Sequence, residues 1–304
     1  SVISFLSHAV VTGFITAAAI LIISNQLPHM IGLASSPDTS IVGVYSYLLE
    51  EMNEFNQMVV LISCMAVVAL IFCRTHLGSL LRRTGLAGEV IDSLVKSAPM
   101  YVVVIGVVLV RLFSLDTGFE VPVVGEIPTV LPDINIVLMS LERFQELLPS
   151  ALLISMVIFM ESTSIGTAIA SKAREKINPN QELLGLGVAN LGSSLVGGFP
   201  VAGSFARSIV NFSSGSVSPV ASLVTAFLVM IIVLLFATLF FHLPKGVLSA
   251  IIVISAWQLI DFQAVRKIFS FNTADSVTFL FTFLAVLTLG VESGVLIGIA
   301  ISFV

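Results

Sequence analysis

A short segment that glycine and proline interrupt, and that carries one arginine, separates two long apolar runs of this chain. It reads Gly-Gly-Phe-Pro-Val-Ala-Gly-Ser-Phe-Ala-Arg-Ser over residues 197–208. Irregular backbone at membrane depth is tolerated only where protein buries it or where it lines a cavity, because lipid offers no hydrogen-bond partners. An arginine at that depth is costly and usually functional. The segment therefore predicts an anion site at a break between two helices.

The composition places these apolar runs in a membrane. Of the 304 residues, 57% are hydrophobic and 10% are charged, and the mean hydropathy is +1.10. A soluble domain carries about 25% charged residues. The 13 Lys and Arg residues are spread in small groups, so no basic surface for nucleic acid is expected. We therefore predict an all-α polytopic membrane protein with no nucleic-acid partner.

Basic residues indicate which loops face the cytoplasm. They gather at 74–96, 172–176 and 266–267, whereas the acidic segment 35–56 contains none. The second and third groups should lie on the same side, so an even number of crossings separates them. Only three long apolar runs lie between them, which leaves residues 201–212 as the missing crossing. Because this segment is too short to span as a helix, we expect an extended stretch followed by a half-helix, as in transporter binding sites.

The half-helix is predicted to begin at Gly203 and Ser204. The first N–H groups of a helix lack internal partners, and the helix dipole adds positive charge there, so this end binds anions. Arg207 lies one turn later and adds a full positive charge. The alternatives are that the glycines serve only close helix packing, and that Arg207 is a structural tie to a carbonyl or an acid.

Glu161 is the second charge inside an apolar run, at 147–170, and hydroxyl residues follow it. Ser164, three residues later, shares its helix face. A buried carboxylate pairs with a cation, holds a metal ion or takes up a proton. Glu161 and Ser164 are therefore candidates for binding a coupling ion, either Na⁺ or H⁺. The alternative is a structural pair between Glu161 and Arg207.

Several stretches of the sequence resemble the sulfate permease (SulP) family, whose animal relatives include prestin and pendrin. They are residues 7–14, 190–194 with 197–200, 203–211 and 290–294. These stretches are similar, in order, to the start of the family's fifth helix, the end of its ninth, the signature of its tenth and the turn into its last. The resemblance runs along the whole chain.

The resemblance implies a fold of fourteen segments in two inverted repeats of seven, in which a core domain moves against a gate domain. The chain would hold segments five to fourteen, without helices one to four and without a C-terminal STAS domain. The implied parts are gate helices five to seven at 1–120, an extracellular loop at 121–146, core helices eight to eleven at 147–243, and gate helices twelve to fourteen, truncated, at 244–304.

The resemblance also implies a binding site between the N-termini of helices three and ten. Its contacts map onto Gly203, Ser204, Phe205, Ala206 and Arg207. Glu161 occupies the eighth-helix position where family members often carry a coupling acid. Many members have Ser where this chain has Ala206, so only the backbone donor remains there and the substrate preference stays open.

We therefore expect secondary active transport of an inorganic anion, with sulfate as the default substrate and symport with H⁺ or Na⁺. Bicarbonate or a dicarboxylate is the alternative substrate. An uncoupled anion channel or exchanger of the same fold is the alternative class, against which Glu161 argues. A serine hydrolase at Ser204 would need a nearby base, and no histidine lies inside an apolar run. We expect no enzyme and no cofactor, and a homodimer in a bacterial cytoplasmic membrane.

Overall fold

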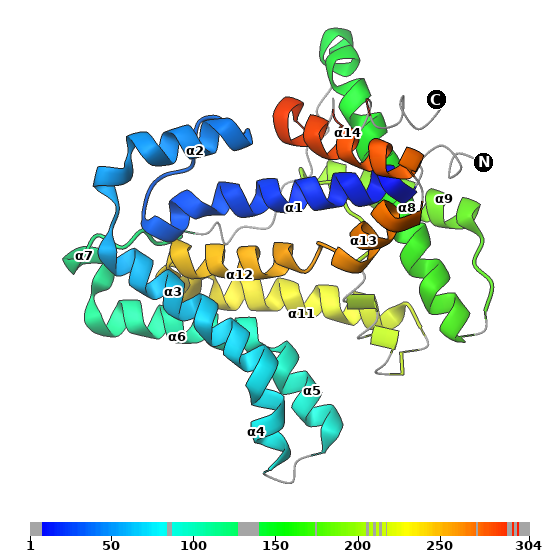
Figure 1. Ribbon diagram of the computed structural model, residues 1–304. Helices are drawn as coiled ribbons and strands as arrows, with labels where there is room; N and C mark the ends of the chain where they lie inside the picture. The colour runs from blue at the N-terminus through cyan, green and yellow to red at the C-terminus, as the bar shows by residue number, and fades with distance from the viewer. Residues whose placement is uncertain are drawn as a thin grey trace. The chain divides into compact units, whose positions relative to one another are not determined.

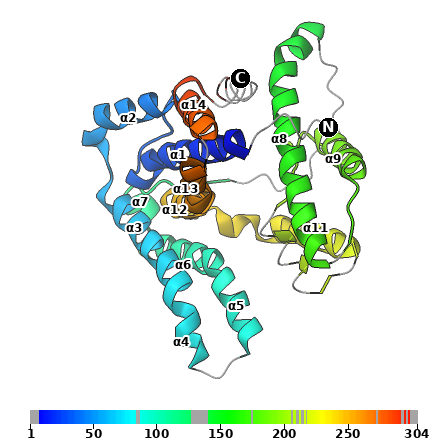
Figure 2. The same ribbon diagram turned by 45° about the vertical axis from the view of Figure 1, so that its right-hand side comes forward.

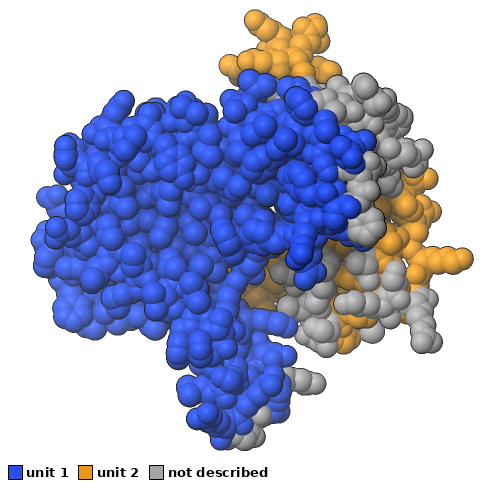
Figure 3. All heavy atoms as spheres, in the orientation of Figure 1, with its two compact units in different colours: residues 1–128, 236–304 blue, residues 129–235 orange. Residues whose placement is uncertain are grey.

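The structure is a computed structural model, and it describes residues 8–83, 87–126, 140–173, 175–204, 207–208, 211–212, 215–216, 218–271, 273–290, 294 and 297. Within these ranges the secondary structure is helical, apart from one isolated β-bridge between Val123 and Pro244. The predicted all-α fold class is confirmed. The chain divides into two compact units, which are unit 1 (residues 1–128 and 236–304) and unit 2 (residues 129–235) (Figure 3).

Five helical stretches of the described residues are long and apolar enough to cross a membrane. They are Ala9–Ile31, Gln57–Arg82, Leu141–Thr167, Val220–Phe240 and Lys245–Ser270. A sixth span results if the pair Val90–Lys96 and Ala98–Phe113, which is bent by 52°, counts as one. The chain is thus a multi-pass membrane protein.

Unit 1 contains most of the helices (Figure 1). They are α1 (His8–Ile31), α2 (Ile41–Glu50), η2 (Met52–Glu54), α3 (Gln57–Phe72), η3 (Cys73–Leu77), α4 (Gly78–Arg82), α5 (Gly88–Lys96), α6 (Ala98–Phe113), α7 (Leu115–Gly118), η4 (Ala237–Phe240), α12 (Lys245–Trp257), α13 (Phe262–Phe271) and α14 (Thr273–Leu289). Helix α1 packs against both α12 and α14, and α12 packs in turn against α3.

Small and hydroxyl-bearing residues allow these helices to approach closely. A Cβ atom on Gly13 of α1 would lie 2.9 Å from the carbonyl oxygen of Phe279 in α14. Thr16 and Thr282 are buried, and each donates its hydroxyl to the carbonyl four residues earlier in its own helix, at 2.7 Å. Helices in membranes associate through such small residues, because apolar side chains gain no hydrophobic free energy by moving from lipid to a helix interface, and close packing must stabilise the contact instead.

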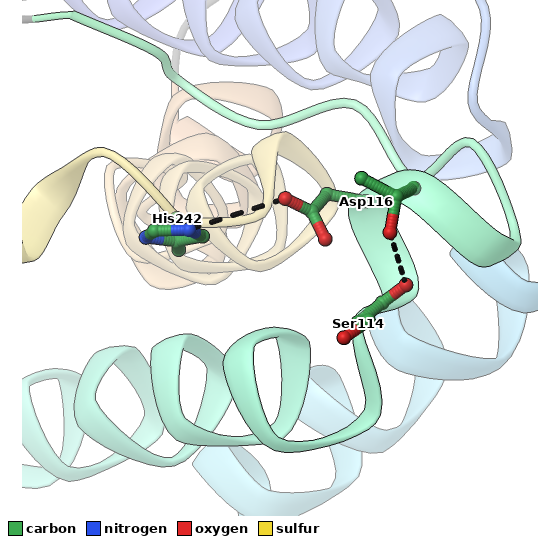
Figure 4. Close-up of polar contacts among 4 residues, drawn as sticks. Ser114, Asp116 and His242 are labelled. Carbon is green, nitrogen blue, oxygen red and sulfur yellow. Dashed lines mark hydrogen bonds and ion pairs between the residues drawn. The ribbon is translucent and has the colours of Figure 1, made fainter.

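A segment without helix, residues 121–125, follows α7 and is bonded to the turn before α12; we call it the strap. Its backbone bonds to that turn, from Val124 N–H to the Leu243 carbonyl (3.0 Å) and from Gly125 N–H to the Phe241 carbonyl (3.1 Å). Beside the strap, the Asp116 carboxylate reaches toward His242, with 4.0 Å between Oδ2 and Nε2 (Figure 4). The strap is therefore attached to this turn mainly by backbone hydrogen bonds.

Unit 2 contains α8 (Leu141–Ala173), α9 (Pro179–Leu195) and α11 (Val220–Phe236). The last residue of α11, Phe236, already belongs to unit 1. Helices α8 and α9 pack against each other. The α9 N-terminus is capped by Asn178, whose side chain accepts the Asn180 N–H at 3.0 Å. Residues 236–243, which the sequence interpretation groups with the core helices, cluster with unit 1. The gate and core roles of the two units stay predictions.

Candidate functional site

The predicted break begins where α9 ends. Gly197 adopts φ +66°, in the left-handed region that glycine enters without steric cost. Gly198 N–H then donates to the Ser193 carbonyl at 2.8 Å, which closes the last turn of the helix. The chain therefore leaves α9 abruptly, at the two glycines that the sequence singled out.

Side chains of α9 hold the next residues, which have no regular secondary structure. Asn190 is paired with the backbone of Val201, since its Oδ1 accepts the Val201 N–H at 2.9 Å and its Nδ2 donates to the Val201 carbonyl at 3.0 Å. Ser193 Oγ donates to the Phe199 carbonyl at 2.8 Å. These contacts give the backbone groups of Phe199 and Val201 hydrogen-bond partners in a stretch that has no regular secondary structure of its own.

Helix α8 holds the other end of the same stretch. Gly203 N–H donates to Ser162 Oγ at 2.9 Å, and Ser162 is 7% exposed. A Cβ atom on Gly203 would lie 3.0 Å from that oxygen and 3.3 Å from the Ser162 Cα. Glycine at this position therefore allows α8 and this stretch to touch. We call residues 198–204, held by Asn190, Ser193 and Ser162, the clamped break.

The helix resumes directly after the clamped break. Ser208 N–H donates to the Ser204 carbonyl at 2.9 Å, and residues 207–208 and 211–212 are helical. Phe205 and Ala206 lie outside the described residues. The Gly203 N–H already has a partner in Ser162 Oγ.

The two charges that the sequence predicts inside the membrane are both exposed in unit 2. Arg207 lies one turn into the resumed helix, and Glu161 lies next to Ser162 on α8. Among the described side chains neither residue forms an ion pair, so a structural pair between Glu161 and Arg207 has no support here. The side chain of Ser164, the second predicted ion ligand, lies outside the described set.

A cavity of about 500 Å³ lies within unit 2 and reaches the clamped break. Ser162 and Gly203 form part of its wall, together with Ser208 of the resumed helix. Glu175 and Glu182 line it as well, from the connection into α9 and the first turn of that helix. The contact between α8 and the helix start is thus next to a space that a small solute or ion can enter.

The sequence interpretation selected neither Asn190 nor Ser162 as a site residue. Asn190 carries a signal that would have found it, since an amide inside an apolar helix needs a hydrogen-bond partner. Ser162 carries a weaker signal, as one of several hydroxyls after Glu161. Their partners, Val201 and Gly203, depend on the fold. In the described part of the chain, no group of three or more His, Cys, Asp or Glu side chains is arranged to hold a metal ion.

Comparison with known proteins places this geometry in context. Residues 1–282 match the model of the Sulfate permease family. The probable sulfate transporter 4.2 of Arabidopsis thaliana is 30% identical over 300 residues, which make up 99% of this chain and 42% of that protein. The chain thus spans less than half the length of this curated relative.

Two solved structures have the same fold. The structure of SLC26A9 aligns with a TM-score of 0.86 at 21% identity, over 98% of this chain and 46% of that one. The transmembrane domain of a cyanobacterium bicarbonate transporter, BicA, aligns with a TM-score of 0.73 at 20% identity, over 99% of this chain and 69% of that one. At these identities the likeness concerns the fold.

Proposed function

This chain belongs to the sulfate permease family, and on that basis we propose that it forms part of a secondary active transporter for an inorganic anion, with sulfate as the substrate. The curated relative in Arabidopsis is described as a probable sulfate transporter. Family and relatives are transporters rather than enzymes, so a hydrolase at Ser204 is set aside.

The observation that carries the proposal is the clamped break. Three side chains from α8 and α9 fix this stretch, so that the helix after Ser204 begins at a defined place beside the cavity. The N–H groups of a first helical turn, with the helix dipole, attract an anion. Arg207, exposed in the same turn and without an ion pair among the described side chains, adds a full charge. We take Ser204 to Arg207 as the anion seat.

The coupling ion is assigned to Glu161, with Ser164 as a second ligand. Ser162 supports this assignment, because it is bonded to Gly203 and directly follows Glu161 in the chain. A proton or Na⁺ taken up at Glu161 would change the local electrostatics of α8 at the point where α8 touches the helix start. Ion binding and anion binding could then favour the same position of the break, which is what symport requires.

Two finer proposals come from the resemblance alone. The protein would act as a homodimer, and it would lie in the cytoplasmic membrane of a bacterium. Bicarbonate remains the second candidate substrate, since BicA, which shares the fold, is described as a bicarbonate transporter.

Uptake by the full-length protein tests the substrate and the seat together. Labelled sulfate, bicarbonate and succinate would be compared with and without Na⁺ and at two pH values. Phe205→Pro removes one backbone donor, and proline is tolerated in a first helical turn. Losing one charge-assisted hydrogen bond costs about 1.5–3 kcal/mol, so we expect sulfate affinity to fall about ten- to a hundredfold. Arg207→Gln should weaken divalent anions more than monovalent ones.

Glu161→Gln separates coupling from binding. The variant should bind sulfate, measured by calorimetry, but its uptake should no longer depend on Na⁺ or pH. Retention of the wild-type ion dependence would reject the coupling role and leave the seat intact. Unchanged sulfate affinity in both Phe205→Pro and Arg207→Gln would instead remove the seat from this break.

A further inference from the structure

A helical hairpin of unit 1 lies apart from the helices discussed so far. It consists of η3, α4 and α5, within the described residues 73–83 and 87–96, and we call it the basic hairpin. Figures 1 and 2 show α4 and α5 projecting beyond the other helices of unit 1 in both views. Helix α5 then meets α6 at a bend of 52°, so it does not simply extend the α6 span.

The inner faces of the basic hairpin pack on each other. Ile91 of α5 is 2% exposed, and a Cβ atom on Gly78 of α4 would lie 3.6 Å from Val95 Cγ2, within ordinary contact distance. Helix α5 contacts α4 and η3 as well as α6. The apolar side of α5 thus packs inside the hairpin, and the opposite side of α5 belongs to the outer surface of the hairpin.

The outer surface combines positive charge with exposed apolar side chains. Its four cations are all exposed, and they are Arg74, Arg82, Arg83 and Lys96. Only two acids, Glu89 and Asp92, occur in residues 73–96. Among the described side chains, none of the four cations has a carboxylate within ion-pair distance. Leu80 and Val90 are 55% and 46% exposed on the same hairpin. A surface that combines cations with exposed apolar side chains is stable neither fully in water nor fully in hydrocarbon.

The length of the span brings this surface to the membrane boundary. The stretch Gln57–Arg82 contains 26 residues, and at 1.5 Å per residue it is about 39 Å long. A bilayer's hydrocarbon core is about 30 Å thick. The last turns, with Arg82, therefore extend past the hydrocarbon into the headgroup layer. Basic residues indicate the cytoplasmic side, where the leaflet carries anionic lipids.

We propose that the basic hairpin binds the phosphate headgroups of anionic phospholipids in the cytoplasmic leaflet. The cations near the end of the span contact the phosphates, Arg74 extends its long side chain toward them from within the span, and the exposed Leu80 and Val90 lie at the boundary with the acyl chains. Clusters of four to eight Lys and Arg residues immediately cytoplasmic of a spanning helix are a known footprint of anionic-lipid binding. None of these residues belongs to the anion seat of unit 2, so lipid binding and transport can be tested separately.

The test uses the purified full-length protein in a non-ionic detergent and two fluorescent lipids, phosphatidylglycerol and phosphatidylcholine. We expect tighter binding of phosphatidylglycerol, and we expect added salt to weaken it. The double substitution Arg82→Gln with Arg83→Gln should reduce this preference about tenfold or more. Lysine at both positions should keep the preference, because charge at range is required rather than a planar fork.

The matched control is Arg111→Gln, an exposed cation in the last turn of α6, at the helix end away from the hairpin. It should leave the preference unchanged. If the first double variant does not fold, by circular dichroism, the pair Arg74→Gln with Lys96→Gln takes its place. Full preference in a folded double variant, or an equal loss in Arg111→Gln, overturns the proposal. Competition by inorganic phosphate as strong as that of unlabelled phosphatidylglycerol would also overturn it, because the ligand would then be a free anion.

Discussion

The strap in unit 1 and the clamped break in unit 2 are both stretches without helix that follow helices, but different groups hold them. The strap is bonded backbone to backbone, with Lys245 N–H donating to the Pro122 carbonyl at 2.9 Å beside the bonds of Val124 and Gly125. The clamped break is bonded to side chains, through Asn190, Ser193 and Ser162.

The difference predicts how each region tolerates change. Backbone hydrogen bonds survive nearly every substitution, because every residue except proline carries the same donor and acceptor. Side-chain clamps, in contrast, are lost with one substitution of the residue that makes them. The strap thus suits a fixed end of a unit, whereas the clamped break places its helix start through a few specific residues.

Asn190→Ala should have the largest effect on this comparison. It removes both bonds to the Val201 backbone, which are exposed, and each such hydrogen bond contributes about 0.5–1.5 kcal/mol net. We expect much faster hydrogen exchange in residues 199–203 and a loss of sulfate uptake, with exchange in the strap unchanged. Asn180→Ala, at an exposed position of the same helix, is the control. Equal exchange in the two variants would mean that Asn190 does not hold the break.

Gly203→Ala ranks second. Its new Cβ would lie 3.0 Å from Ser162 Oγ and 3.3 Å from Ser162 Cα, so one segment must move. Overpacking of this kind costs about 1–3 kcal/mol, and we expect sulfate affinity to fall with it in calorimetry. Gly185→Ala in α9 is matched, since no atom lies within 4 Å of its added Cβ. Wild-type affinity in Gly203→Ala would show that the close approach of α8 is dispensable.

Ser162→Ala tests the hydrogen bond itself and should have a smaller effect. It removes the acceptor of the Gly203 N–H but creates no clash, and an ordinary hydrogen bond contributes about 0.5–1.5 kcal/mol net. Exchange at the Gly203 amide should accelerate, and threonine should restore protection. Ser155→Ala is the control, because among the described residues that hydroxyl bonds within α8, to the Leu152 carbonyl. Slow exchange in Ser162→Ala would assign the Gly203 amide to another partner.

Asp116→Asn should change least. The pair with His242 spans 4.0 Å, and its side chains are 23% and 32% exposed, so solvent screens it. Such pairs are worth about 0–1 kcal/mol, while the backbone bonds of the strap remain. We expect a small or undetectable fall in the thermal unfolding temperature of the full-length protein. The unfolding temperature of Asn190→Ala would be measured alongside. If Asp116→Asn lowered the unfolding temperature as much as Asn190→Ala, side chains would hold the strap as well.

The sequence by itself determined the class of protein and the place of the break. Low charge and long apolar runs require helices that satisfy their own hydrogen bonds in lipid. Gly197, Gly198 and Pro200 lie where α9 ends, and the helix resumes after Ser204 as expected. These features are local in the chain, so they can be read from composition and from the conformations that glycine and proline permit.

Only the tertiary structure decided what holds the break. Asn190 bonds to Val201 eleven positions later, and Ser162 bonds to Gly203 across 41 positions. It also showed Arg207 and Glu161 without an ion pair among the described side chains, although the sequence left a mutual pair open. Residue types indicate which groups need partners, but the partners depend on which helices the fold brings together.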